Sequence, residues 1–95
     1  MRLVWSKRAN QDRREIVEYI WPNDRAAAIR IDRLIRSAAQ RLLKYPYIGR
    51  VGLIPGTREL IPHGSYRIVY RALDAEIRIL MVVHTSRQWP PEPDE

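Results

Sequence analysis

SYRIVYRALDAEIRILMVVHTSR, residues Ser65 to Arg87, is the stretch that decides the fold. Apolar and polar residues alternate on both sides of Asp74-Ala75, which is the pattern of a two-stranded hairpin with one buried face. If Asp74 and Ala75 form the turn, Leu73 lies opposite Glu76 and one face is almost wholly apolar. That face contains Tyr66, Ile68, Tyr70, Ile77, Ile79, Met81 and Val83. We therefore expect it to pack against a layer of helices.

The opposite face of the predicted hairpin collects Arg67, Val69, Arg71, Arg78, Leu80, Val82 and His84. Arg71 lies directly opposite Arg78, a like-charge pair that lowers stability unless solvent or an anion intervenes. Arg67 and His84 are diagonal neighbours within reach of one small group. A histidine can exchange a proton beside a phosphate that an arginine stabilises, so the pair is a catalytic candidate. The alternative for His84 is a strand-end side chain bonded to a nearby carbonyl.

Upstream of the hairpin, the pattern predicts two helices and two more strands. The predicted elements are a strand at Arg2–Trp5, helices from Ser6 to about Ile20 and over residues 24–44, a loop at 49–56 and a strand at Thr57–Ile61. Ser6 is placed to cap the first helix, and Pro22 breaks the helical run, so the helices form an antiparallel hairpin. The fold class is therefore α+β, an antiparallel helical hairpin on a small, mainly antiparallel sheet in the order β-α-α-β-β-β.

Length and composition narrow the class of protein. Ninety-five residues predict a single domain over residues 1–89, followed by a flexible proline-rich acidic tail at 90–95. The chain has no cysteine and two histidines, so we expect no disulfide, no metal site and no cofactor. Neither a secretion signal nor a membrane-spanning stretch is recognisable, which favours a soluble, cytoplasmic protein without a membrane partner.

The positive charge is concentrated ahead of the tail. Glu92, Asp94 and Glu95 are three of the 11 acidic residues, which leaves 17 basic against 8 acidic residues over residues 1–91, a net charge of +9. Fifteen of the basic residues are arginine, whose planar fork suits phosphate and carboxylate recognition. A solvated surface, a surface for polyanions and a surface for an acidic protein partner remain open as interpretations.

Motifs along most of the chain resemble the RelE/ParE superfamily of toxins from bacterial type II toxin–antitoxin systems. They are Ala9…Ile16…Tyr19-Ile20, Asn23 to Ala27, Leu43 to Arg50, Gly56 to Leu60, Tyr66 to Tyr70 and His84 to Pro90. The resemblance implies the same fold and a growth-inhibiting toxin that a cognate antitoxin neutralises. The antitoxin is expected to lay an acidic C-terminal segment along the basic helices and sheet, and to supply all contact with operator DNA.

The resemblance also implies two alternative targets. ParE-like members poison DNA gyrase, whereas RelE-like members are endoribonucleases that cut mRNA on the ribosome. The helical hairpin, the Tyr45–Arg50 turn and the Gly56–Leu60 strand look ParE-like, whereas the Tyr66–Tyr70 strand looks ribonuclease-like. Arg58 and Leu60 replace the lysine pair of the best-known ribonuclease, and its C-terminal tyrosine is missing. Gyrase poisoning is therefore the preferred hypothesis, and an inactive binding module is a third.

Each hypothesis has its own candidate residues. For a ribonuclease, the candidate catalytic residues are Arg67, which matches the family's strand arginine, and His84, Arg58, Glu59 and Arg87. Glu59 is alternatively the ion-pair partner of Arg58 or Arg67. The candidate partner-binding residues are Arg13, Arg71, Arg78 and Trp89. Arg13 interrupts the apolar line of the first helix, where it either loosens the helix or marks a contact site. The three tryptophans, Trp5, Trp21 and Trp89, are expected to pack.

Overall fold

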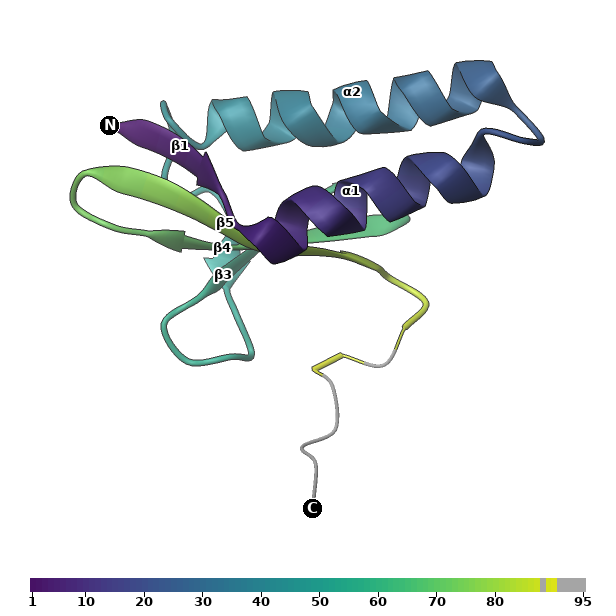
Figure 1. Ribbon diagram of the computed structural model, residues 1–95. Helices are drawn as coiled ribbons and strands as arrows, with labels where there is room; N and C mark the ends of the chain where they lie inside the picture. The colour runs from purple at the N-terminus through teal and green to yellow at the C-terminus, as the bar shows by residue number, and fades with distance from the viewer. Residues whose placement is uncertain (88, 91–95) are drawn as a thin grey trace.

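The computed structural model of the chain describes residues 1–87, 89 and 90 (Figure 1). Its elements are β1 (Arg2–Trp5), α1 (Lys7–Ile20), α2 (Arg25–Arg41), β2 (Arg50–Val51), β3 (Arg58–His63), β4 (Tyr66–Ala72) and β5 (Glu76–His84). The predicted α+β class is confirmed, and so are the predicted strands and helices to within a few residues. β2 is an addition, because it lies inside the segment predicted as a loop at 49–56. Of the predicted tail at 90–95, residues 91–95 lie outside the described residues.

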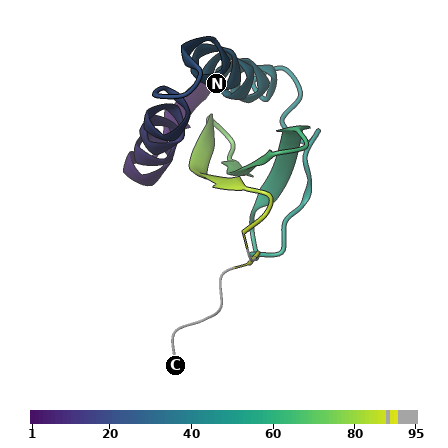
Figure 2. The same cartoon turned by 90° about the vertical axis from the view of Figure 1, so that its right-hand side faces the viewer.

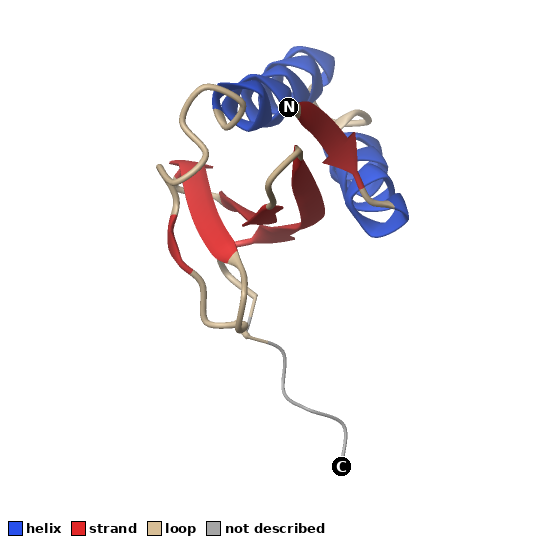
Figure 3. Ribbon diagram, turned by 90° about the vertical axis from the view of Figure 1, so that its left-hand side faces the viewer, coloured by secondary structure: helices blue, strands red, loops and turns tan. Residues whose placement is uncertain are grey.

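The sheet has the strand order β1-β5-β4-β3-β2. β1 runs parallel to β5, and the other neighbouring strands are antiparallel. Both helices lie against the same side of the sheet, as Figures 2 and 3 show. We call the side against the helices the helix face and the other side the open face. No helix in the described part of the chain is long and apolar enough to cross a membrane.

Polar side chains start both helices where the sequence predicts them. Ser6 Oγ accepts a hydrogen bond from the amide of Ala9 at 2.9 Å, which satisfies one of the free N–H groups of the first turn of α1. Asp24 Oδ1 does the same for Ala27 in α2. α2 ends at Arg41 rather than at residue 44, because the amides of residues 42–44 bond three residues back in a tighter turn.

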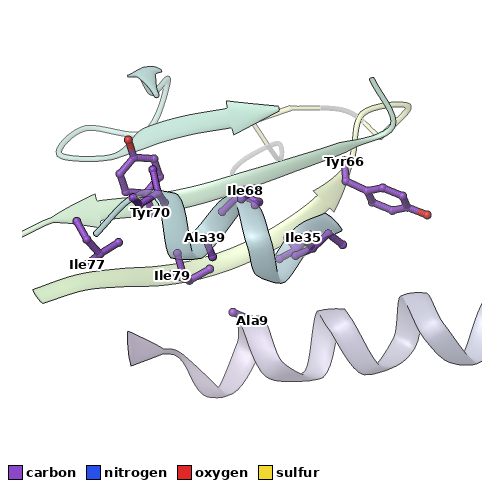
Figure 4. Close-up of a cluster of buried hydrophobic side chains, with 11 residues drawn as sticks. Ala9, Ile35, Ala39, Tyr66, Ile68, Tyr70, Ile77 and Ile79 are labelled. Atoms are coloured by element: carbon purple, nitrogen blue, oxygen red, sulfur yellow. The ribbon is translucent and has the colours of Figure 1, made fainter. Parts of the chain in front are cut away.

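The core lies between the two helices and the helix face (Figure 4). Its helical side is built mostly from Ala9, Ile35, Ala38, Ala39 and Leu42, and its sheet side from Tyr66, Ile68, Tyr70, Ile77, Ile79 and Val82. The small alanines let the helices approach the sheet closely, so that the larger strand side chains fill the space. Five of the seven residues predicted for the buried hairpin face are in this core.

The other two, Met81 and Val83, are displaced by a β-bulge between β4 and β5. Arg71 pairs with Arg78 and Tyr70 with Ile79, as predicted, but Arg67 pairs with Val83 and Tyr66 with His84. One extra residue of β5 therefore reverses the faces of its last part. Arg67 lies on the open face and His84 on the helix face, so the predicted juxtaposition of these two side chains is wrong.

The tryptophans differ in burial. Trp5 packs against the core, and the Trp89 side chain is partly buried over the open face. Trp21 is 41% exposed at the end of α1, where Arg25 lies over its ring at 5.3 Å. The prediction that all three tryptophans pack is therefore wrong for Trp21.

Candidate functional site

The open face is organised around the buried carboxylate of Glu59, on β3. Its Oε1 lies 3.2 Å from Arg50 Nη2, of β2, and 3.3 Å from Arg67 Nε, of β4. Its Oε2 accepts hydrogen bonds from the amide of Leu53 at 3.1 Å and from the indole of Trp89 at 2.7 Å. One side chain therefore connects β2, β4, the loop before β3 and the segment after β5.

These donors keep Glu59 ionised. Burial by itself raises the pKa of a carboxyl group, because it disfavours the charged form. The hydrogen bonds from Trp89, Leu53 and Arg50, together with the charge of Arg67, outweigh burial and hold the pKa of Glu59 below its ordinary value of 4.5. Glu59 is thus a structural anion rather than a group poised to exchange protons near neutral pH.

Arg67 is enclosed rather than open to a ligand. Its side chain is only 11% exposed, and its guanidinium carbon lies 5.3 Å from the centre of the Trp89 ring. Nε and Nη1 are buried without a well-aligned hydrogen bond to any residue that the structure describes, so the ion pair with Glu59 is their compensation.

His84 lies on the other side of the sheet. Its ring meets the edge of Tyr66 at 5.2 Å, and its Nδ1 accepts a hydrogen bond from the amide of Ser86 at 3.0 Å. The side chain is exposed and borders a cleft of about 610 Å³ between α1 and the end of β5. Arg8, Arg87, Asp12, Glu15 and Tyr19 are among the other residues lining this cleft. Of the candidate catalytic residues, only Arg87 accompanies His84.

Arg58 is separate from both groups. It pairs with Tyr70 in the sheet, so its side chain leaves on the helix face, opposite to that of Glu59. Nη1 donates to the carbonyl oxygen of Gly49 at 2.9 Å, and the guanidinium lies 5.0 Å from the centre of the Tyr47 ring. The five candidate catalytic residues are therefore divided among three places, and the structure forms no single cluster from them.

Comparison with known proteins gives this fold a family. A family model described as the ParE toxin of the type II toxin–antitoxin system parDE matches residues 3–89. The chain belongs to the ParE toxin family. The putative toxin Y4kP of Sinorhizobium fredii is 37% identical over 89 residues, which are 94% of this chain and 93% of the relative. Toxin RelE2 of Caulobacter vibrioides is 33% identical over 85 residues, or 90% of this chain and 96% of that toxin.

Solved structures share the fold of this ParE-family toxin. The chromosomal ParDE system from P. aeruginosa includes a chain that matches with a TM-score of 0.78 at 23% identity, covering 88% of this toxin and 95% of that chain. The YoeB/ParE toxin from Agrobacterium tumefaciens matches with a TM-score of 0.62 at 18% identity, covering 88% and 98%. The family model and the two relatives confirm the predicted membership of the RelE/ParE superfamily.

Among the predicted partner-binding residues of the toxin, Arg13 has an internal role. It donates to both oxygens of Asp32 on α2, at 3.1 and 3.3 Å, and lies 4.5 Å from the centre of the Trp5 ring. Arg13 therefore ties α1 to α2 and to β1. Arg71 and Arg78 form the predicted cross-strand pair, and Arg78 Nε donates to Glu76 at 2.8 Å. The partner-binding role of these residues stays a prediction.

Asp12 is the residue that sequence inspection missed. It is buried on α1, where Oδ2 accepts a hydrogen bond from the amide of Val82 at 2.9 Å and Oδ1 accepts one from Arg8. Its spacing from Ala9 and Ile16 places it on the inner face of α1, and a carboxylate at such a position is a recognisable signal.

In the described part of the chain, no three His, Cys, Asp or Glu side chains gather as a metal site would require.

Proposed function

We propose that this ParE-family toxin inhibits growth by poisoning DNA gyrase, and that a cognate antitoxin neutralises it. The observation that carries the preference for gyrase over mRNA is the separation of Arg67 from His84 by the sheet. For the pair to act together, His84 must come within hydrogen-bond reach, about 3 Å, of an oxygen at the same scissile phosphate that Arg67 stabilises. Residues on opposite faces of a sheet do not meet this condition.

The surroundings of Arg67 support the same preference. An arginine that stabilises a scissile phosphate must present its N–H groups to that phosphate. Here the guanidinium is paired with Glu59 and lies under the Trp89 ring, so a phosphate would have to displace both while approaching a buried carboxylate. Like charges make that approach unfavourable.

The ribonuclease alternative retains one supporting observation. His84 is exposed beside a cleft that Arg8 and Arg87 also line. A histidine and two arginines that line one cleft have the composition of a phosphate-cleaving site, although Asp12 and Glu15 line the same cleft and reduce its positive charge. On this alternative the catalytic pair is His84 and Arg87, and Arg67 is structural.

Two assays run in parallel test the proposal. Purified toxin added to gyrase and supercoiled DNA should accumulate cleaved DNA complexes, and toxin added to translating ribosomes should leave the mRNA intact. Toxins that carry His84→Ala or Arg87→Ala should inhibit the growth of the producing cell, in whose cytoplasm we expect them to act, as strongly as the wild type does. Cleavage of mRNA that His84→Ala abolishes would establish the ribonuclease instead. Expression without any growth defect would favour the inactive binding module.

The charge of the toxin supports the proposed antitoxin. Residues 1–91 carry a net charge of +9, which favours a partner segment rich in Asp and Glu. The cleft of about 610 Å³ between α1 and β5, which Arg8 and Arg87 line, offers a groove for such a segment. We propose that the antitoxin occupies it and that the toxin reaches operator DNA only through the antitoxin.

A further inference from the structure

Large apolar side chains are exposed along the β2 edge of the sheet. Tyr47 is 69% exposed, Val51 75% and Leu53 62%. We define the edge patch as Tyr45, Tyr47, Ile48, Val51 and Leu53, which come from the segment joining α2 to β2, from β2 itself and from the loop after it. β2 is the last strand in the sheet order, at the outer margin of the sheet in Figure 3. Tyr45, Tyr47 and Ile48 line one shallow cleft, and Val51 and Leu53 follow them closely in the chain. Exposed hydrophobic residues that gather in this way commonly mark an interaction site.

The backbone beneath the patch is held firmly in place. The buried Tyr70 hydroxyl donates to the carbonyl oxygen of Pro46 at 2.8 Å and accepts from the amide of Gly49 at 3.0 Å. Arg58 adds a hydrogen bond to Gly49, and Glu59 binds the amide of Leu53. The exposed side chains therefore project from an ordered base, which reduces the entropy that a partner must overcome on binding.

The charge around the patch indicates which kind of partner would bind there. Residues 41–58 contain Arg41, Lys44, Arg50 and Arg58 and no acidic residue. Among the described residues, Arg50 is paired with Glu59, which leaves three cations beside the patch without an ion-pair partner. Arg41 and Lys44 line a shallow cleft together with residues 45–48. A second copy of the toxin would bring like charges together, whereas an acidic protein segment with apolar side chains would match both the charge and the hydrophobicity.

The backbone of β2 adds a geometric preference. β2 pairs with β3 through Arg50 and Val51, and it has no neighbour on its other side among the described strands. An open strand edge can bind an extended segment as an additional strand. Because β2 and β1 are the two outermost strands, this edge is on the far side of the sheet from β1 and its neighbour β5.

We propose that the edge patch is the surface by which the toxin docks on its target protein, through an extended acidic segment of that protein. This inference rests on the proposed function, since it needs a target, and it leaves the cleft between α1 and β5 to the antitoxin. The two partners then contact different edges of the same sheet.

The test is a double variant, Val51→Glu with Leu53→Glu. Both side chains are mostly exposed, so the fold should tolerate the change. The matched control is Ile29→Glu with Leu73→Glu, which changes two other exposed apolar residues and the charge by the same amount. Each protein is assayed for growth inhibition on expression, for gyrase cleavage complexes, for copurification with the antitoxin and for its melting temperature.

We expect the edge variant to lose growth inhibition and to need at least tenfold more protein to form cleavage complexes, while the control behaves as wild type. Both should keep their melting temperature and copurify with the antitoxin. Undiminished toxicity of the edge variant would overturn the inference, as would loss of antitoxin binding by that variant alone. A single-stranded oligonucleotide probe that binds the wild type and not the edge variant would also overturn it, in favour of nucleic acid.

The same assays separate this inference from the proposed function. If the wild type inhibits growth without forming gyrase complexes and the edge variant is harmless, gyrase is the wrong target but the docking surface stands. If both proteins form gyrase complexes equally well, gyrase stands and the docking surface is wrong. A wild type that does not inhibit growth overturns both.

Discussion

A carboxylate with no solvent contact must find donors within the protein or become protonated. Glu59 finds them in Arg50, Leu53, Arg67 and Trp89, which come from four separate segments. Such a group is hard to replace, because losing it leaves several donors and one buried cation unpaired. The open face therefore depends on this one residue more than on any single apolar contact.

Glu59→Gln should lower the free energy of unfolding by about 2 kcal/mol, because it leaves the enclosed Arg67 without a counter-charge. Urea denaturation followed by circular dichroism measures the change. Glu18→Gln is the control, since Glu18 is exposed on α1, and it should change stability by less than about 0.5 kcal/mol. Equal stability of the two variants would mean that the ion pair contributes nothing.

The lowered pKa of Glu59 predicts a pH dependence. A carboxyl group whose pKa is lower in the folded than in the unfolded protein stabilises the fold above its unfolded pKa, and this contribution is lost as the pH falls through the folded pKa. The stability difference between wild type and Glu59→Gln should therefore be largest near pH 7 and shrink below pH 4.5. Denaturation curves at several pH values measure it. A difference that grows on acidification would contradict the assignment.

At the scale of elements, side chains at the start of α1 bind the backbone of β5 beyond the point where β1 ends. β1 pairs with β5 only as far as Trp5 and Ile79. Ser6 Oγ then donates to the carbonyl oxygen of Leu80 at 2.8 Å, and Asp12 accepts from the amide of Val82. Side chains of α1 thus replace the missing strand at the β-bulge, and this fixes both the bulge and the position of the helix.

Asp12→Ala should lower the free energy of unfolding by about 2 kcal/mol, because it leaves the amide of Val82 buried without an acceptor. Asp12→Asn keeps an acceptor oxygen and should lose less. Amide hydrogen exchange checks the mechanism, since the protection of Val82 should fall in the alanine variant and persist in the asparagine variant. Unchanged protection in both would show that another group satisfies this amide.

The elements were predictable from sequence, whereas the bulge was not. Alternation fixes the register near the Asp74-Ala75 turn, but Leu80-Met81-Val82-Val83 are all apolar, so a shift by one residue leaves the pattern unchanged. β2 escaped notice because two residues among glycines carry no periodic signal. The partners of Glu59 and Arg13 depend on packing between distant segments, which a single sequence does not specify.

At the scale of the whole molecule, the toxin has two layers, one of helices and one of strands. The helices cover one face of the sheet (Figure 2), and the Trp89 side chain covers part of the open face. The two edges differ as well, because the cleft lies between α1 and the end of β5, the neighbour of β1, whereas the β2 edge carries the edge patch. This asymmetry provides the two separate surfaces that our proposals assign to the antitoxin and to the target protein.

The net charge predicts strongly salt-dependent association with the antitoxin. With +9 over residues 1–91, encounter with an acidic segment is accelerated by long-range attraction. Raising the salt concentration from about 20 mM to about 300 mM should slow association at least tenfold and change dissociation much less. Stopped-flow fluorescence measures both rates. A salt-independent association rate would mean that apolar contacts alone drive the encounter.

β1 pairs with β5, so Arg2 and Glu76 are neighbours in the sheet although they are 74 residues apart in the sequence. During synthesis, β1 and both helices emerge before the strand that they pack against has been made. β5 also separates β1 from β4, so no earlier strand can take its place. A nascent chain that ends before Glu76 has helices with no complete sheet to cover, and long-range pairing of this kind forms late. The toxin therefore folds in the producing cell only after the last strand has been translated.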